Sequence, residues 1–129
     1  MNEQVIQPQI IVMEDETVIR ELICKSLRKK GHDVLEAPDG QVAIDLFQSL
    51  DVDTRVRTVL ILDLIVPGGL GGRETLREIR QLAPAVKAII ASGLADDGEL
   101  SDLEEPGKTS ILTKPYNMQD LDAALRSVW

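Results

Sequence analysis

The feature that most constrains the fold of this chain is the alternation of five short apolar runs with longer stretches in which apolar residues recur at the spacing of an α-helix. Apolar runs of four to six residues are typical of strands buried on both faces of a parallel sheet. We expect strands at residues 9–13, 33–37, 58–62, 87–91 and 110–113. Strict alternation of strand and helix favours right-handed crossovers. The sequence therefore predicts an α/β fold in which helices cover both faces of one parallel sheet.

Capping signals and apolar stripes define the predicted helices. A helix over residues 16–30 ends at Gly31, a good C-cap residue. The next helix begins at Asp39 and Gly40, a third covers residues 73–82 before Pro84, and the last begins at Asn117. The expected buried stripes are Val18, Ile19, Leu22, Ile23, Ser26 and Leu27 in the first helix; Ala43, Leu46, Phe47 and Leu50 in the second; and Met118, Leu121, Leu125 and Val128 in the last.

Two segments have weaker patterns. Residues 51–57 are polar, and we expect a loop there. Residues 96–108 contain only Leu100 and Leu103 as apolar anchors and are broken by Pro106 and Gly107, so we expect a short, weak helix. Residues 1–8 are expected to be an N-terminal tail and residues 9–129 one domain, with no output domain after Trp129.

Length and charge limit the function. A chain of 129 residues is long enough for one domain with its own core. The net charge of −8 opposes direct binding to nucleic acid or to an anionic membrane. No apolar run reaches membrane-spanning length and the N-terminus lacks signal-peptide features, so we expect a cytoplasmic protein. The single cysteine, Cys24, excludes an internal disulfide.

Charged or polar side chains directly follow four of the five predicted strands. The carboxyl ends of parallel strands meet at one edge of the sheet, which is where such sheets bind ligands. The residues at these strand ends are Glu14, Asp15 and Glu16 after the first strand, Asp63 after the third, Ser92 after the fourth and Lys114 after the fifth.

This set of side chains suits phosphoryl chemistry. Carboxylates that converge at one edge repel each other unless a cation lies among them, and carboxylate oxygens suit Mg²⁺. Beside a bound cation, one carboxylate can act as a nucleophile, since aspartate forms acyl phosphates. Lys114 would supply positive charge, and the Ser92 hydroxyl a hydrogen-bond donor, for the transferring phosphoryl group. Taken singly, each residue has a plainer explanation: acidic residues favour helix N-termini, and aspartate and serine are common in turns.

The sequence resembles the receiver domain of two-component response regulators. The resemblance rests on the segments 11–16, 60–68, 89–93 and 112–116, which occur in order with the spacing of that family. It implies a flavodoxin-like (βα)5 fold with strand order 2-1-3-4-5. It also implies that the domain accepts a phosphoryl group and is not a turnover enzyme.

The resemblance also implies a role for each site residue. Asp63 would be the phosphoryl acceptor and Asp15 a direct Mg²⁺ ligand. Glu14 would act on the metal through water, and the backbone carbonyl of Ile65 would be a further ligand. The residues that would contact the phosphoryl oxygens are Ser92 and Lys114.

The implied donor is a phosphohistidine on a sensor histidine kinase or phosphotransfer protein, and the implied signal is a conformational switch read by a downstream protein. The glycine-rich loop at residues 67–72, with Ser92 and Gly93, is similar to receivers fused to hybrid sensor kinases, which would make this chain a relay module. We expect partner contacts on the last helix and on residues 96–108.

Two positions depart from the family pattern. Glu14 stands where the family more often has aspartate, and Ile111 stands where an aromatic residue usually couples to the hydroxyl of Ser92. Two residues beyond Asp63 and Ser92 stand Ile65 and Leu94. Neither side chain can orient an attacking water, so we expect slow self-dephosphorylation.

Two other functions remain open. A receiver-fold protein-binding module that is not phosphorylated would explain Ile111 and the weak pattern at 96–108, although Asp63, Asp15 and Lys114 are all present. An Mg²⁺-dependent phosphohydrolase with an aspartyl nucleophile usually carries a second aspartate two residues later, where this chain has Ile65.

Overall fold

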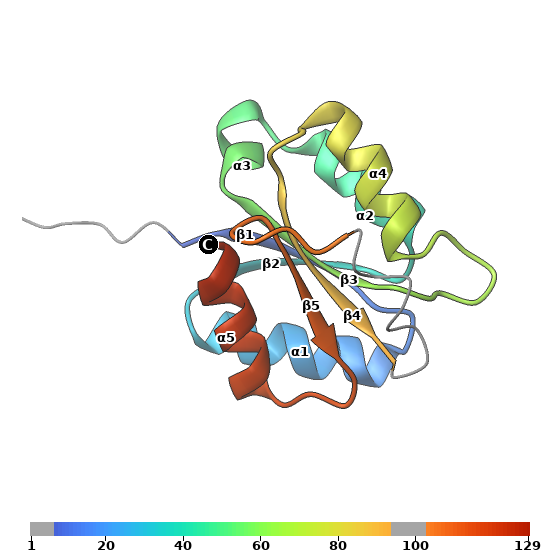
Figure 1. Cartoon of the computed structure of the whole chain (residues 1–129), viewed down its shortest axis with the longest axis vertical. Coiled ribbons are helices and arrows are strands. Elements are labelled where there is room, and N and C mark those ends of the chain that lie inside the picture. The colour runs from blue at the N-terminus through green and yellow to red at the C-terminus, as the bar shows by residue number, and fades with distance from the viewer. Residues whose placement is uncertain (1–6, 94–102) are drawn as a thin grey trace, which may run out of the picture.

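Five parallel strands form a single sheet that lies between two layers of helices (Figure 1). The computed structural model of the chain describes residues 7–93 and 103–129. The strand order is β2-β1-β3-β4-β5, which confirms the predicted α/β fold and its order 2-1-3-4-5. The strands are β1 (Gln9–Met13), β2 (Asp33–Ala37), β3 (Thr58–Asp63), β4 (Lys87–Ser92) and β5 (Thr109–Thr113).

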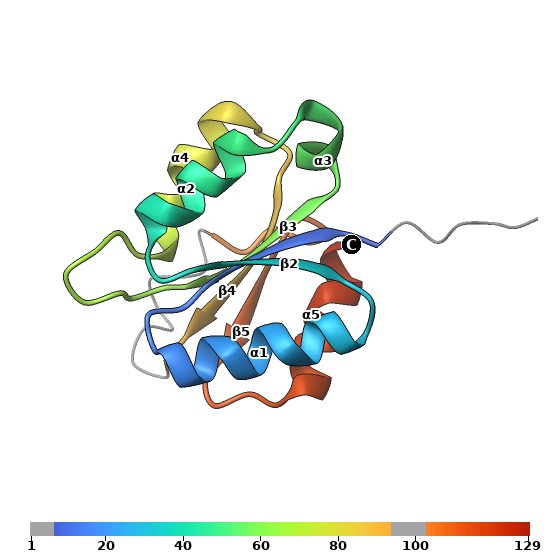
Figure 2. The same cartoon turned by 180° about the vertical axis from the view of Figure 1, so that it is seen from behind.

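Alternate residues of the central strands supply two separate cores. In β1, Ile10 and Val12 face helices α1 (Thr17–Lys29) and α5 (Met118–Val128), whereas Ile11 and Met13 face α2 (Gly40–Ser49) and α4 (Gly72–Leu82). Both layers are visible in Figure 2, where α1 and α5 lie on one side of the sheet and α2 and α4 on the other. Because both faces are covered, β1 and β3 are buried along their whole length.

The apolar stripe predicted for α1 is wider than the face that the helix buries. Ile23, Cys24 and Leu27 are buried, whereas Val18 is 70% and Leu22 is 62% exposed. The prediction that Val18, Ile19 and Leu22 belong to the core is therefore wrong. The sheet contacts one narrow side of α1, and the other apolar side chains of its first two turns point away from that contact.

The loop expected over residues 51–57 contains a short helix, α3 (Val52–Val56). Asp51 caps it, because its carboxylate accepts a hydrogen bond of 2.7 Å from the backbone N–H of Thr54. This helix was not predicted because no apolar stripe marks it in the sequence. In the structure its two valines are exposed and none of its residues is buried. In α2, Ala43 and Phe47 are buried as predicted, together with Ile44, while Leu46 and Leu50 are partly buried.

The helix caps agree with the sequence where the structure describes them. Gly31 follows α1 with a φ of 92°, the left-handed conformation expected of a C-cap glycine. Asn117 and Asp120 form a reciprocal capping box at the start of α5. Of the weak helix expected over 96–108, residues 96–102 lie outside the described residues. Residues 103–108 are not helical: they form turns around an isolated bridge between Glu105 and Thr109. Residues 1–6 of the expected tail also lie outside them.

Membrane spanning has no support in the described part of the chain. Among residues 7–93 and 103–129, no helix is both long enough and apolar enough to cross a bilayer.

Candidate functional site

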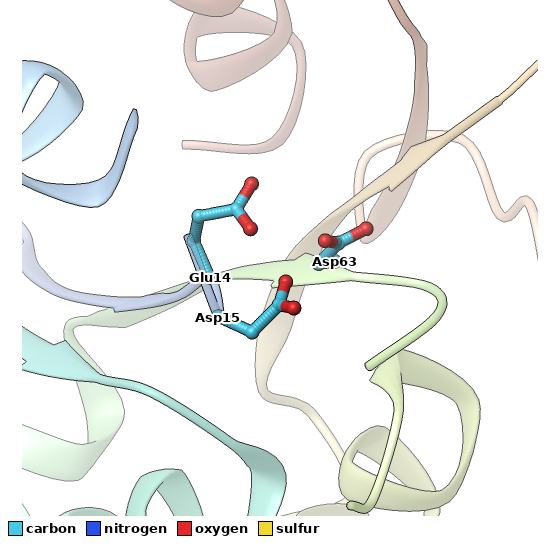
Figure 3. Close-up of side chains that lie close together, drawn as sticks. All are labelled: Glu14, Asp15 and Asp63. Carbon is cyan, nitrogen blue, oxygen red and sulfur yellow. The ribbon is translucent and has the colours of Figure 1, made fainter. Parts of the chain in front are cut away.

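Three carboxylates meet where β1 and β3 end. Asp63 is the last residue of β3, and Glu14 and Asp15 directly follow β1, its neighbour in the sheet. One oxygen from each side chain lies within 4.8 Å of those of the other two. Figure 3 shows the three side chains gathered at these strand ends. The structure therefore brings together three of the four residues predicted to bind metal.

Two of these carboxylates are buried. Glu14 is 4% and Asp63 is 7% exposed, whereas Asp15 is exposed. Glu14 is held in place by a hydrogen bond of 3.1 Å from the backbone N–H of Glu16, at the start of α1. Burial of two neighbouring acidic groups is costly unless positive charge lies close to them.

Lys114 supplies that charge. Its Nζ donates a hydrogen bond of 3.0 Å to Oδ1 of Asp63 and lies 3.7 Å from Oε1 of Glu14. The lysine follows β5, and its backbone N–H donates to the carbonyl of Ser92 at the end of β4, 2.7 Å away. The sheet thus positions the ammonium group between the two buried carboxylates.

The mutual influence of these groups appears in their pKa values. Burial raises the pKa of Glu14 from 4.5 to about 7, and the neighbouring Asp15 and Asp63 add to the rise. Burial opposes the charged form of Lys114, but its hydrogen bond to Asp63 and the charges of Asp63 and Glu14 raise its pKa above the ordinary value. Burial, followed by the charges of Glu14 and Asp63, raises the pKa of Tyr116 to about 12.

The carboxylate cluster fits a hard divalent cation. Its donors are carboxylate oxygens alone, the ligands that Mg²⁺ prefers, and its exposed member, Asp15, leaves room for water on the metal. Burial raises the pKa of Glu14 although Lys114 lies close to it, so the ionised carboxylate has too little positive charge around it. A divalent cation at this position would supply that charge.

Ser92 and Ile65 lie at the same edge of the sheet. Ser92 is the last residue of β4 and is 3% exposed, but its hydroxyl donates to the carbonyl of Gly93 at 3.0 Å and not to Asp63. The side chain of Ile65 is 59% exposed, which leaves an apolar surface beside the acceptor position. Leu94 lies outside the described residues. The roles assigned to Ser92, Ile65 and the other site residues stay predictions.

Gly72, the last residue of the glycine-rich loop at residues 67–72, contributes to the site although the sequence analysis gave it no role there. This first residue of α4 packs so closely on β3 that a Cβ atom would lie 2.8 Å from the carbonyl oxygen of Asp63. Its backbone N–H also donates to the carbonyl of Leu64 at 3.0 Å. The doublet Gly71-Gly72 just before a helix was the available signal, since glycine permits close backbone approach.

The sequence matches a known family over nearly its whole length. A family profile described as the response regulator receiver domain matches residues 10–126. Response regulator RR06 of Streptococcus pneumoniae is 33% identical over 109 residues, covering 84% of this chain and 47% of that protein. The sensor kinase CckA of Brucella abortus is 28% identical over 121 residues, covering 92% of this chain but only 12% of the kinase. The chain thus spans less than half of either relative.

Solved structures agree with this match. A response regulator receiver domain protein from Clostridium thermocellum superposes with a TM-score of 0.80 at 30% identity, covering 94% of this chain and 93% of the other. The response regulator TrrA from Thermotoga maritima, solved in complex with Mg²⁺ and beryllofluoride, gives a TM-score of 0.77 at 27% identity and covers 95% and 100% of the two chains.

Proposed function

Because this chain belongs to the response regulator receiver domain family, we propose that it accepts a phosphoryl group on Asp63 in two-component signalling. The observation that carries the proposal is the position of Lys114 Nζ, 3.0 Å from Asp63 Oδ1 and 3.7 Å from Glu14 Oε1. A nucleophilic carboxylate beside a fixed cation is suited to an incoming phosphoryl group, whose charge the same cation can share.

The chain's own residues divide the work of the transfer. One oxygen of Asp63 attacks phosphorus while the bond from phosphorus to the donor atom breaks, and the electron pair leaves with the donor. The donor that we propose is a phosphohistidine, whose departing imidazole nitrogen keeps that pair. Lys114 pairs with the phosphoryl oxygens, and the Ser92 hydroxyl turns from Gly93 to donate to them.

Glu14, Asp15, Asp63 and the backbone carbonyl of Ile65 would hold a divalent cation, which we propose is Mg²⁺. When bound, such an ion would offset the carboxylate charge and the charge that develops on the phosphoryl oxygens. Asp15 is the residue best placed to bind it directly, since it is the exposed member of the cluster. The buried Glu14 would act through water, its longer side chain already fixed by the N–H of Glu16.

The proposed partners follow from this chemistry. A sensor histidine kinase or a phosphotransfer protein would donate the phosphoryl group, and a downstream protein would read the phosphorylated state. In this role the chain is a stoichiometric acceptor in the cytoplasm and not an enzyme that turns over an external substrate. The likeness to the sensor kinase CckA supports a role in a phosphorelay.

Intact mass after incubation with acetyl phosphate and Mg²⁺ tests the proposal. We expect the wild-type chain to gain one phosphoryl group, and we expect no gain for Asp63→Asn or when a chelator removes Mg²⁺. Glu104→Gln serves as a control, since it removes an exposed carboxylate outside the site. If the wild type neither gains mass nor binds beryllofluoride, the chain is instead a receiver-fold binding module that is not phosphorylated.

A further inference from the structure

The side chain of Arg20, in the first turn of α1, reaches back to the backbone of the carboxylate cluster. Its Nη1 donates a hydrogen bond of 2.8 Å to the backbone carbonyl of Glu14. That carbonyl belongs to the peptide that joins Glu14 to Asp15, and both residues carry carboxylates of the cluster (Figure 3). Arg20 therefore holds, from outside the cluster, the peptide that two of its three members share.

Glu36 in β2 holds another edge of the Arg20 guanidinium. Its Oε1 lies 3.4 Å from Nε of Arg20, and the two side chains are 32% and 14% exposed, so water screens this ion pair only in part. Arginine presents its donors in a rigid planar fork, which allows one guanidinium to bind two partners in fixed directions. A strand of the sheet thus orients Arg20, and Arg20 in turn binds the Glu14 carbonyl.

Three contacts fix Glu14, and each acts on a different group. Its backbone N–H donates to the carbonyl of Ala37 at 3.0 Å, and its carboxylate accepts from the N–H of Glu16 at 3.1 Å. The bond from Arg20 is the one of the three that acts on the peptide leading to Asp15. Because Asp15 is exposed, the direction of its carboxylate depends on how that peptide is held.

Orientation matters for a cation such as Mg²⁺, which demands near-ideal octahedral geometry. Residues that orient metal ligands without touching the metal typically contribute about 10- to 100-fold to metal affinity. The charge of Arg20 acts in the opposite direction, because a positive side chain near the cluster repels a second cation. Positioning and charge therefore predict opposite effects on cation affinity when Arg20 is removed.

We propose that Arg20, oriented by Glu36, is a positioning residue that fixes the Glu14–Asp15 peptide for binding of a divalent cation. The inference deepens the proposed function and rests on it for its effect on phosphoryl transfer. Asp63 and Lys114 bind each other directly, and Arg20 acts on a different part of the site. Loss of Arg20 thus raises the Mg²⁺ concentration that transfer requires and leaves the maximal rate unchanged.

Mn²⁺ binding tests the positioning role without a phosphoryl donor. Mn²⁺ takes the same oxygen ligands as Mg²⁺, and the free ion is counted by its electron paramagnetic resonance signal. Arg20→Met should weaken Mn²⁺ binding by about tenfold or more, and Mg²⁺ binding, measured by competition, in parallel. Unchanged or tighter Mn²⁺ binding in Arg20→Met would overturn the proposal, since charge alone would then explain the result. A wild type that binds no Mn²⁺ would refute the metal site and the positioning role together.

Arg28→Met is the matched control. Arg28 also lies on α1 and donates to Glu36, at 3.2 Å from Nη1 to Oε2, so its loss removes the same charge and a contact to the same carboxylate. The bond from Arg20 to Glu14 stays in place. We expect Arg28→Met to bind Mn²⁺ as the wild type does, and a loss equal to that of Arg20→Met would overturn the proposal.

Glu36→Gln tests the link through β2 and carries the test if Arg20→Met does not fold. It keeps Arg20 but removes the charge that orients it, so Mn²⁺ binding should weaken. In the Arg20→Met background the same change should alter affinity by less than about twofold, because the two residues act on one peptide. Full loss in both backgrounds would show that Glu36 does not act through Arg20.

A titration of phosphoryl transfer separates this inference from the proposed function. The initial rate of mass gain from acetyl phosphate is measured against Mg²⁺ concentration. Arg20→Met should need about tenfold more Mg²⁺ for half of the maximal rate and should reach the maximal rate of the wild type. A lower maximal rate at an unchanged Mg²⁺ requirement would overturn the positioning role. A wild type that binds Mn²⁺ but gains no phosphoryl group would refute the proposed function, while the Mn²⁺ affinities still decide the role of Arg20.

Discussion

Ile65 places an apolar side chain beside the acceptor carboxylate, where a polar side chain could orient a hydrolytic water. Its 59% exposed side chain offers no hydrogen-bonding atom. We predict that Ile65→Gln speeds loss of the phosphoryl group from Asp63 by roughly tenfold or more, because the amide can position the attacking water. Intact mass followed over time measures the rate, and Ile65→Leu is the apolar control. Equal lifetimes in the wild type and Ile65→Gln would show that this position does not limit hydrolysis.

Glu14 gives the metal-free chain a specific pH dependence. Its pKa of about 7 in the folded state exceeds the 4.5 of an unperturbed glutamate, so the folded state binds the proton more tightly than the unfolded state. The free energy of unfolding contributed by this group therefore falls as pH rises from about 4.5 to 7. Glu14→Gln removes this contribution.

Urea unfolding in a chelating buffer measures the effect. As pH rises from 5 to 7.5, the free energy of unfolding of Glu14→Gln should increase relative to that of the wild type by on the order of 1 to 3 kcal/mol. Glu104→Gln, an exposed substitution of the same kind, should show no such gain. A pH-independent difference between Glu14→Gln and the wild type would contradict the raised pKa.

At the scale of elements, the contact between α2 and α4 depends on a glycine. A Cβ atom on Gly40, the first residue of α2, would lie 2.0 Å from Oγ1 of Thr75 in α4 and 2.8 Å from the carbonyl oxygen of Leu70. We predict that Gly40→Ala lowers the free energy of unfolding by roughly 1 to 3 kcal/mol through overpacking, despite the better helix propensity of alanine. Gly93→Ala, where a Cβ would have no neighbour within 4 Å, is the control. If urea unfolding shows both variants equally stable, the helices can separate without cost.

The helices also show which predictions from local sequence succeed. The capping box of α5 was predictable because Asn117 and Asp120 are three residues apart and act on each other's backbone. The buried face of α1 was not, because Val18, Leu22 and Leu27 are equally apolar in sequence and only contact with the sheet distinguishes them. For α3, the Asp51 cap was a visible signal, but the missing apolar stripe pointed to a loop.

At the scale of the whole molecule, metal binding should stabilise the fold. An ion that binds the folded carboxylate cluster but not the unfolded chain adds about 1.4 kcal/mol at a concentration ten times its Kd. We predict that Mg²⁺ raises the melting temperature of the wild type above that in NaCl of equal ionic strength. The increase should be absent in Asp15→Asn, which removes the exposed carboxylate of the cluster. An equal rise in both proteins would indicate general screening of the net charge of −8.

The sequence by itself determined the succession of strands and helices along the chain and which edge of the sheet carries the polar residues, whereas the order of the strands within the sheet was implied by the family resemblance. Apolar runs such as residues 59–62 are local signals, and parallel strands place their carboxyl ends at one edge whatever their order. For this reason the sequence alone was enough to place Glu14, Asp15, Asp63 and Lys114 at the same edge of the sheet. Their proposed roles came from family resemblance and stay predictions.

Only the tertiary structure decided how deeply each of these groups is buried and what it faces. The proximity of Lys114 to both Asp63 and Glu14 depends on β5 lying beside β4, and the pKa of Glu14 depends on burial by elements distant in sequence. The ion pair between Arg20 and Glu36 likewise joins α1 to β2. Charge, burial and side-chain pairing result from contacts between distant segments, and a local pattern of residues does not contain them.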